Sequence, residues 1–370
     1  MASTHSQKEH VIVIGAGIIG ISIAYHLACR GTQVTVLDKQ APGSGCTQGA
    51  FAMLIASHSV GPAELNDLYG LAVAEWRQLA VQLGTALPIQ WGGVVNWAGP
   101  GKQAEEMVRT HERLKGWGVR VEGLVEGDVE RLVPGAVPGV FGTGAFLPDW
   151  GAVDVGKAFG VLVQRAKDVG VVIRTPVEVL SVVSSSGKPG KPSVTTDQGQ
   201  LVADKVVVAA GAGTPRLLQP LGTPIAIKMV SGTLAYSKPL PPVLHRVVNG
   251  PLGSIRQNPD GRIVTGLDYA PGADGQDTSD AYGRMLLQRA AEVIPALAGA
   301  ELDTMTIGHV PIPGDSTPIL GFCDGGEKVY VATMMSGITL APLMGRLAAT
   351  EILGHSLSLL EGYRPGRFAD

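Results

Sequence analysis

Residues 11–38 read VIVIGAGIIGISIAYHLACRGTQVTVLD, and this stretch decides the fold. The β-branched run Val11–Ile14 predicts a strand that enters a glycine-rich turn, and the apolar segment after the turn predicts a helix. A second strand follows at Val34–Leu37 and ends at Asp38. A strand, a GxGxxG turn, a helix, a strand and an acid, in this order, are typical of a Rossmann unit that binds a dinucleotide.

Each glycine of the turn has a separate task. Gly15 allows the tight turn, Gly17 lets the backbone approach a pyrophosphate, and Gly20 lets the helix pack closely on the strand. The helix N-terminus then offers N–H groups and a positive dipole end to the phosphates. Asp38 is placed to hydrogen-bond a ribose hydroxyl, which favours FAD or NAD over NADP. The turn residues Ala16, Ile18 and Ile19 complete this set of expected cofactor contacts.

The bulk composition describes a globular protein of two domains. The chain has 370 residues, of which 45% are hydrophobic and 16% charged. With a net charge of −3 and no basic run, it gives no support to nucleic-acid binding. Three scattered cysteines, without CxxC spacing, suit a reduced cytoplasm and argue against a disulfide framework or a metal site.

The chain shows no targeting or membrane signal. The N-terminal residues MASTHSQKEH are polar, and no uninterrupted apolar run approaches the length of about 18 residues that a spanning helix needs. We therefore expect a cytoplasmic protein without a membrane span, and homo-oligomerisation stays open.

Helical and strand patterns alternate along the chain. Periodicity predicts helices at 64–83, 103–117, 155–169, 279–294 and 340–353. Strand patterns occur at 88–97, as a pair within 171–183, as a meander over 194–196, 200–202 and 205–209, and at 225–236, 254–269, 302–310 and 329–332. A turn or loop is expected at 187–192, and a Pro-Asp-Gly turn at 259–261.

The order of these patterns predicts an α/β (α+β) protein with a split nucleotide domain. We expect a Rossmann-like domain that binds a dinucleotide, FAD or NAD, with an inserted, antiparallel-β-rich substrate domain. The predicted boundaries are 8–84, 145–218 and 306–370 for the dinucleotide-binding domain, which the resemblance described below makes FAD-binding, and 85–144 and 219–305 for the substrate-binding domain.

Four segments resemble the D-amino-acid-oxidase-like flavoprotein superfamily, and within it most of all the glycine-oxidase and sarcosine-oxidase-type enzymes. They are GAGIIGISIAYHLACRG (15–31), GCTQGAFAMLIA (45–56), VVVAAGAGT (206–214) and the long C-terminal segment 318–353. The segments occur in the family's order over nearly the whole chain. The resemblance implies an extended FAD and the two-electron oxidation of an amine or amino-acid C–N bond. Hydride goes to flavin N5, the imine is hydrolysed, and O2 reoxidises the flavin to give H2O2.

The resemblance adds further expected cofactor contacts. Small residues near the flavin let backbone N–H groups approach it, with Thr47 as the side-chain donor, and Cys46 is expected to pack rather than to carry a covalent flavin. The helix opening at Gly337 would direct its positive dipole end at the reduced flavin. The remaining positions are Lys39, Ser44, Gly49, Ala50, Phe51, Ala52, Met53, Leu54, Val177, Ala210, Gly211, Ile338 and Thr339.

The substrate pocket departs from the family's pattern. Glycine oxidases hold the substrate carboxylate with an arginine in a Gly-x-Arg-Pro segment, which here reads GHVP and places Val310 at the arginine position. Arg256, which shares a strand face with Ser254, is the expected replacement. Met334 and Met335 stand where a more polar pair often sits. Weaker candidates for polar contacts are His245 and His309.

These features predict an FAD-dependent amine oxidase with no certain catalytic side chain, because flavin N5 carries the chemistry. The expected substrate is an N-substituted glycine or secondary amine with an apolar group, releasing glyoxylate and a free amine, with O2 as the acceptor. Three alternatives stay open. They are an FAD dehydrogenase for a D-amino acid or 2-hydroxy acid, an NAD-dependent reductase, and a non-catalytic flavin-binding homologue.

Overall fold

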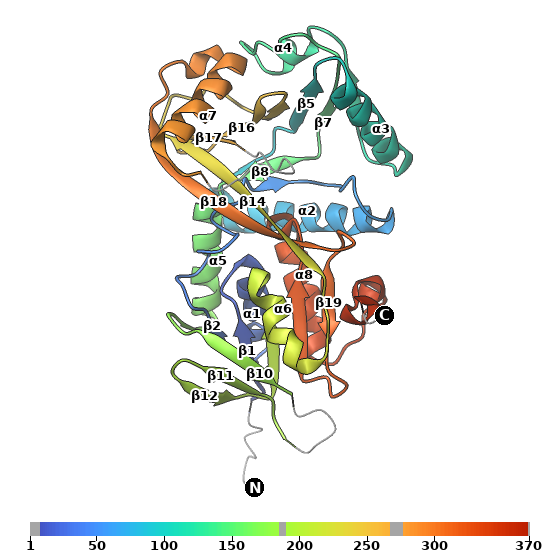
Figure 1. The fold of residues 1–370 in the computed structure, drawn as a ribbon, viewed down its shortest axis with the longest axis vertical. Coiled ribbons are helices and arrows are strands. Elements are labelled where there is room, and N and C mark those ends of the chain that lie inside the picture. Colours follow the sequence, from blue (N-terminus) through green and yellow to red (C-terminus); the bar gives the residue numbers. More distant parts are fainter. Residues whose placement is uncertain (1–7, 185–189, 267–276, 369–370) are drawn as a thin grey trace. The chain divides into compact units, whose positions relative to one another are not determined.

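The computed structural model describes residues 8–184, 190–266 and 277–368 (Figure 1). The chain divides into two compact units. Unit 1 comprises Met1–Thr47, Phe159–Met229 and Val310–Asp370, and unit 2 comprises Gln48–Ala158 and Val230–His309. The chain therefore leaves unit 1 twice to build unit 2. Three elements contain a boundary between the units: α5 (Val155–Asp168), β14 (Ile227–Ser237) and β18 (Leu302–Pro313).

Unit 1 is built on a six-stranded sheet. Its order is β19 (Ile319–Phe322), β20 (Val329–Thr333), β13 (Lys205–Val208), β1 (His10–Ile14), β2 (Gln33–Leu37) and β9 (Val172–Arg174). All neighbours are parallel except β19 and β20. The central strands are apolar and buried, as expected when helices cover both faces of a parallel sheet. This is the Rossmann-like arrangement that the N-terminal motif predicts.

Two helices of unit 1 pack tightly against each other beside this sheet. They are α1 (Ile18–Ala28) and α8 (Gly337–Ile352), which lie side by side in Figure 1. A Cβ on Gly345 would lie 2.1 Å from Ser22 Oγ, so the helices meet at a glycine. The Ser22 hydroxyl donates to Ala341 O at 2.8 Å. The rest of unit 1 is a three-stranded sheet of β10 (Val179–Val183), β11 (Ser193–Thr196) and β12 (Gly199–Val202), with the short helix α6 (Thr214–Leu218).

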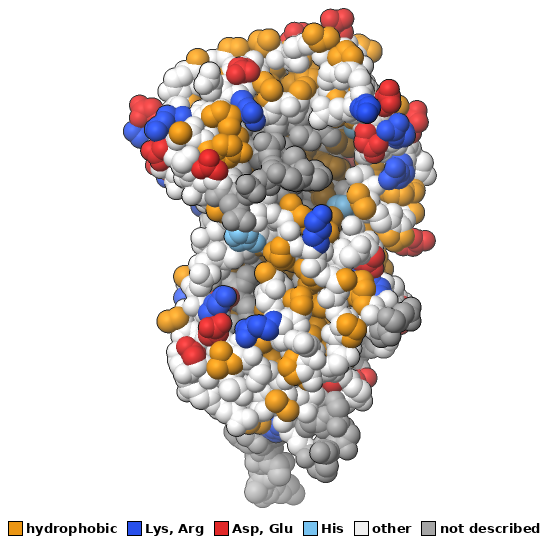
Figure 2. All heavy atoms as spheres, viewed as in Figure 1, with side chains coloured by type: hydrophobic (Ala, Val, Ile, Leu, Met, Phe, Trp, Pro, Cys, Tyr) orange, Lys and Arg blue, Asp and Glu red, His pale blue; other side chains and the backbone are white. Residues whose placement is uncertain are grey.

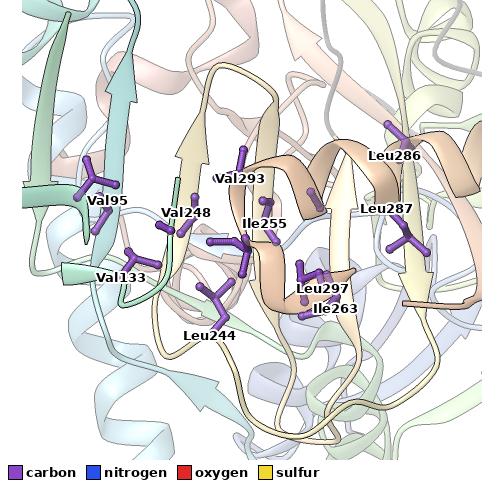
Figure 3. Packing of buried hydrophobic residues seen from close by; sticks show 14 of the residues in the cluster. Val95, Val133, Leu244, Val248, Ile255, Ile263, Leu286, Leu287, Val293 and Leu297 are labelled. Carbon is purple, nitrogen blue, oxygen red and sulfur yellow. The ribbon is translucent and has the colours of Figure 1, made fainter. Parts of the chain in front are cut away.

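Unit 2 carries an eight-stranded sheet. Its order is β18, β14, β17 (Ile263–Gly266), β16 (Gly253–Gln257), β15 (Val247–Gly250), β5 (Val94–Ala98), β7 (Thr143–Leu147) and β6 (Glu122–Leu124). Helix α7 (Asp280–Val293) covers one face, where Val248, Ile255 and Leu287 belong to one apolar cluster (Figure 3). Ser279 caps α7 by accepting from Tyr282 N at 3.2 Å.

Unit 2 also contains a small second sheet and three further helices. That sheet has the order β3 (Met53–Leu54), β8 (Gly151–Val153) and β4 (Ile89–Gln90). The helices are α2 (Glu64–Leu83), α3 (Lys102–Gly116) and α4 (Asp128–Leu132). Six 3-10 helices complete the described chain: η1 (Gly84–Ala86), η2 (Gly211–Gly213), η3 (Gln219–Leu221), η4 (Pro295–Leu297), η5 (Ser358–Tyr363) and η6 (Pro365–Phe368).

Two local expectations about strand pairing are wrong. The strands within 171–183 do not pair with each other, because β9 lies beside β2 whereas β10 pairs with β11. Similarly, β13 does not continue the meander of β11 and β12 but lies between β1 and β20. Sheet membership depends on partners far away in sequence, which local alternation cannot report. The expected turn at 187–192 and the strand end at 267–269 lie partly outside the described residues.

Residues 48–84, 145–158 and 306–309 lie in unit 2 and residues 219–229 lie in unit 1, whereas the sequence predicts the opposite assignment for each stretch. The reason for the first two stretches is strand pairing, since β3 pairs with β8 and β8 in turn pairs with β4, where Gln90 lies opposite Ala152. The last helix begins at Gly337, three residues before the apolar periodicity suggests.

No described helix is long and apolar enough to span a membrane. The described residues contain no group of three or more His, Cys, Asp or Glu side chains that would hold a metal ion. Among the coloured residues of Figure 2, Lys and Arg are interspersed with Asp and Glu rather than gathered into a stripe.

Candidate active site

The glycine turn after β1 is held by direct backbone contacts. Gly15 has φ +107° and donates its N–H to Leu37 O at 2.8 Å. A Cβ on Gly15 would lie 2.3 Å from Ala209 O, and a Cβ on Gly20 would lie 2.0 Å from Gly15 O. Both glycines are therefore required by backbone packing within unit 1, which sets the start of α1 against the sheet.

Gly17 differs from Gly15 and Gly20 because a Cβ at this position would point into unoccupied space. It is the N-cap of α1, and a Cβ there would meet only Thr47 Oγ1, at 3.5 Å, within 4 Å among the described residues. Thr47 accepts from Ile18 N at 3.1 Å, so its hydroxyl closes one side of the helix start. The first turn of a helix has N–H groups that the helix itself cannot satisfy, and an anion fits such a place. This cradle suits the diphosphate of a dinucleotide.

Asp38 links the end of β2 to the glycine turn. Its Oδ2 accepts from Ala16 N at 2.7 Å, and its Oδ1 accepts from Gln40 N at 2.9 Å. Since a carboxylate has about four lone-pair sites, two remain for ribose hydroxyls. Lys39, next to it, is exposed. Val177 is buried in an apolar cluster and donates its N–H to Asp38 O at 2.8 Å.

We expect Asp38→Ala to weaken FAD binding by about 10- to 100-fold, because ribose hydrogen bonds and the Ala16 N–H partner are both lost. The measurement is a titration of apoprotein with FAD, together with a thermal melt. Gln40→Ala is the matched control, since only its backbone N–H takes part. Equal retention of flavin by both variants would show that the carboxylate does not contact the cofactor.

Cys46 is a thiol rather than a thiolate at neutral pH. Burial raises its pKa to about 11. Because the thiolate is the nucleophile, attack on a flavin ring edge is disfavoured. This supports the packing interpretation over covalent attachment at Cys46. Ser44, two residues earlier, is exposed.

Segment 48–54 of unit 2 is held from two sides. Gly49 and Gly308 touch backbone to backbone, since a Cβ on Gly308 would lie 2.4 Å from Gly49 O. Ala52 has φ +60°, and its carbonyl accepts from Val153 N at 3.0 Å. A left-handed alanine costs of order 1 kcal/mol, and such strain persists only where the surroundings over-determine it. Of the other expected contacts, Phe51 and Leu54 are buried, whereas Ala50 and Met53 are half-buried.

A second left-handed residue lies at the start of α8 in unit 1. Ser336 has φ +54° and accepts from Leu340 N at 3.1 Å immediately before the helix begins at Gly337. Ile338 and Thr339 are buried in the first turn. The positive end of this long helix dipole favours negative charge nearby. Ala210 and Gly211, at the end of β13, are half-buried, and Gly211 has φ +53°.

Arg256 is the most unusual charged residue of unit 2. It is 1% exposed, and no carboxylate lies within ion-pair distance of it among the described residues. Its Nε donates to Phe51 O at 2.7 Å, its Nη1 donates to Asn258 Oδ1, and its guanidinium carbon lies 5.3 Å from the Phe51 ring centre. Nη2 has no hydrogen-bond partner among the described residues. Burial lowers the pKa of this guanidinium from its ordinary value, and the electrostatic influence of Tyr236, Asp154 and Asp260 offsets this only in part.

The other substrate candidates occupy separate places. Ser254 is buried on the same strand as Arg256. His309 is exposed, and its Nδ1 lies 2.8 Å from Ser231 Oγ. His245 is exposed in the loop before β15. Val310 is half-buried on β18, and in unit 1 Met334 is buried while Met335 is half-buried.

The sequence does not indicate two features of these sites. No pattern predicts that Ser336 adopts a left-handed backbone conformation or that Gly308 meets Gly49.

A Rossmann-like unit with this glycine turn, combined with an inserted and mainly antiparallel sheet, fits an FAD-binding oxidoreductase. The model of the FAD dependent oxidoreductase (DAO) family matches residues 10–351, and the chain belongs to this family.

Its relatives include glycine oxidases. The chain is 27% identical to glycine oxidase of Geobacillus kaustophilus over 353 residues, covering 93% of each chain. The solved glycine oxidase of that organism superposes with a TM-score of 0.87 at 25% identity, covering 97% of this chain and 99% of that one. The iminodiacetate oxidase of Chelativorans sp. has a TM-score of 0.77 at 25% identity, covering 96% and 98%.

The protein is therefore an FAD-dependent amine or amino-acid oxidoreductase of the glycine-oxidase type. The open face of Gly17, the helix start beside it and the Asp38 carboxylate fit the phosphates and ribose of FAD. When bound, FAD supplies a two-electron acceptor for the substrate C–N bond.

Proposed function

We propose that the protein oxidises an N-substituted glycine whose nitrogen carries an apolar group. The substrate loses a hydride from its α-carbon and a proton from its nitrogen, so that a carbon–nitrogen double bond forms. Water adds to this imine and releases glyoxylate and the free amine. Bound FAD would supply the two-electron acceptor for this step, and O2 would be the final acceptor, which leaves as H2O2.

The observation that carries this proposal is the buried Arg256. A buried cation is costly unless an anion compensates it, and the described carboxylates that act on Arg256, those of Asp154 and Asp260, do so at a distance and form no ion pair with it. A substrate carboxylate would supply the missing charge and accept from Nη2. Ser254, two residues earlier on the same strand face, is the proposed second polar contact.

The apolar part of the proposal rests on three side chains. Val310 replaces a basic residue by the resemblance described above, and Met334 and Met335 stand immediately before α8. Methionine side chains adapt to irregular apolar groups. One relative is named an iminodiacetate oxidase, and iminodiacetate is itself an N-substituted glycine, which supports this substrate class. His245 and His309 are proposed only as peripheral polar contacts.

The direct test is the visible spectrum of the purified holoprotein. Glycine, sarcosine, D-amino acids and bulky N-alkyl glycines are added anaerobically, and air is then admitted. The proposal expects the fastest bleaching with the N-alkyl glycines, followed by recovery of colour with peroxide in air. Faster turnover of glycine or sarcosine would refute the substrate class. Bleaching without recovery in air would indicate a dehydrogenase, and no bleaching by any compound would favour a non-catalytic flavoprotein.

Arg256→Met is expected to raise KM for an N-alkyl glycine by about 100-fold or more, because a charged hydrogen bond to the carboxylate is lost. KM for a secondary amine without a carboxylate should change little. Arg256→Lys should recover part of the loss. Arg262→Met, on the same hairpin but half-exposed and paired with Asp303, is the matched control. An equal loss for both substrates in Arg256→Met would assign this arginine to structure alone.

A further inference from the structure

The guanidinium of Arg256 is held by two neutral oxygen atoms. Its Nε donates to the backbone carbonyl of Phe51 at 2.7 Å, and its Nη1 donates to the side-chain amide oxygen of the buried Asn258. Neither acceptor carries a charge, so both hydrogen bonds orient the guanidinium without neutralising it. A buried arginine is ordinarily paired with a carboxylate, which makes the amide at position 258 the feature to explain.

The hairpin turn does not require an amide at position 258. Asn258 is the first residue of the Asn-Pro-Asp-Gly turn between β16 and β17, and its backbone carbonyl accepts from Gly261 N at 2.9 Å. Its backbone N–H donates to Arg262 O at 2.8 Å. Asp, Asn and Ser are all favoured at the first position of such a turn. An aspartate would therefore suit the turn equally well and would be placed to form an ion pair with Arg256.

The two aspartates that act on Arg256 from a distance already have cationic partners. Asp154 Oδ2 lies 3.6 Å from Lys157 Nζ, and Asp260 Oδ2 lies 3.4 Å from the same Nζ. Asp260 Oδ2 also lies 3.9 Å from Arg262 Nε. Because Lys157 and Arg262 offset these carboxylates, the positive charge of Arg256 stays largely uncompensated within the part of the chain that the structure describes.

We infer that Asn258 is a positioning residue that makes the site selective for substrates with a carboxylate. Its neutral amide orients the guanidinium of Arg256 and preserves the positive charge for the substrate. The inference rests on the proposed function, in which Arg256 Nη2 binds the carboxylate of an N-substituted glycine. An amine without a carboxylate gains nothing from this charge, and a cationic amine is repelled by it.

Asn258→Asp tests the inference with almost no change in the size of the side chain. The new carboxylate would pair with Arg256 and take the place of the substrate carboxylate. On the holoenzyme, we expect KM for an N-alkyl glycine to rise by at least about 30-fold. KM for the corresponding secondary amine without a carboxylate should stay within about threefold of the parent value or fall. The calorimetric Kd of acetate, a probe that does not require turnover, should rise as much as KM for the N-alkyl glycine.

The melting temperature reports the charge balance at Arg256 separately from substrate binding. Because Asn258→Asp gives an uncompensated buried cation a partner, we expect the melting temperature to rise by about 3 °C or more. Asn258→Ala removes the acceptor instead, so it should lower the melting temperature and raise KM about tenfold while the preference for a carboxylate is kept. An asparagine with only a structural role would not give higher stability together with lost carboxylate binding.

Arg262→Gln is the matched control for charge. It changes the net charge by the same amount on the same hairpin, and Arg262 Nη1 pairs with Asp303 Oδ2 at 3.1 Å rather than with a group that holds Arg256. The preference for a carboxylate and the Kd of acetate should therefore stay within about threefold of the parent values. An equal loss in Arg262→Gln and Asn258→Asp would assign the effect to overall charge and overturn the inference.

Failure of the inference and failure of the proposed function give different results. If the parent oxidises N-alkyl glycines and binds acetate but Asn258→Asp retains both, the inference is wrong and the proposed function stands. If the parent does neither, the proposed function is wrong, and the melting temperature of Asn258→Asp still shows whether Asn258 leaves Arg256 uncompensated. A melting temperature equal to or below that of the parent, or a variant that does not fold, contradicts the inference.

Discussion

Gly20→Ala is expected to yield no folded holoprotein. A Cβ at this position would lie 2.0 Å from Gly15 O and 3.1 Å from the Gly15 carbonyl carbon. No rotamer change relieves a clash with backbone, and the Gly15 turn is itself held to Leu37 O. Helix α1 would have to lift away from β1. We expect a loss of more than about 3 kcal/mol, a large part of the roughly 5–15 kcal/mol that stabilises a typical domain.

Gly17→Ala is the matched control, because Gly17 lies three residues before Gly20 in the same glycine turn. Gly17 has φ −75° and ψ 176°, a conformation that alanine adopts freely, and its Cβ would make only an ordinary contact with Thr47 Oγ1. The stability of the apoprotein should therefore change by less than about 0.5 kcal/mol. The added methyl group occupies the cradle for the diphosphate, so FAD affinity should fall by about 100-fold or more.

The two variants are compared by urea unfolding, monitored by circular dichroism, and by titration of apoprotein with FAD. Gly20→Ala should lose its stability to urea. Gly17→Ala should keep the stability of the parent and lose its affinity for FAD. A Gly20→Ala protein with the unfolding midpoint of the parent would show that the Gly15 turn can move enough to accommodate the added Cβ. Full FAD affinity in Gly17→Ala would place the diphosphate elsewhere.

Local sequence patterns were sufficient to predict most elements. The helix expected at 64–83 is observed at Glu64–Leu83, because apolar residues recur at helical spacing over its whole length. The first strand and the glycine turn could be predicted for a similar reason. Gly15 and Gly20 have no room for a Cβ, and the spacing of the glycines in the sequence indicates this directly. These features depend on residues close together in the chain.

Contacts between residues far apart in the sequence could not be predicted from local patterns. Arg256 was singled out from its strand face, yet its contact with Phe51 O joins residues 205 positions apart. The placement of β13 between β1 and β20 likewise depends on segments from the start and the end of the chain. The left-handed backbone conformations of Ala52 and Ser336 could not be predicted from their residue types, because the surrounding structure imposes them.

Stability alone does not explain the buried charge of unit 2. Replacing a buried charged group by an apolar one of similar shape is often neutral or stabilising. Arg256 therefore marks the face of the sheet where the proposed substrate carboxylate would complete the hydrogen bonding.

Gly49→Ala is expected to displace segment 48–54 and to abolish substrate oxidation. A Cβ on Gly49 would lie 2.1 Å from Ile307 O and 2.5 Å from Gly308 Cα, and a Cβ on Gly308 would reciprocally clash with Gly49 O. Because two backbones meet here, neither can move without disturbing β18 or the segment. The segment also holds the left-handed Ala52. We expect a loss of about 3 kcal/mol or more.

Gly45→Ala is the control from the same stretch of chain, since a Cβ at Gly45 meets nothing within 4 Å among the described residues and Gly45 is exposed. Its stability and its rate of anaerobic flavin bleaching should match those of the parent within about 0.5 kcal/mol and twofold, respectively. If Gly49→Ala unfolds at the parent's temperature and bleaches at the parent's rate, β18 does not support the segment. If it folds but bleaches at least tenfold more slowly, the backbone contact positions the segment for catalysis, because the shift then acts on the reaction rather than on the fold.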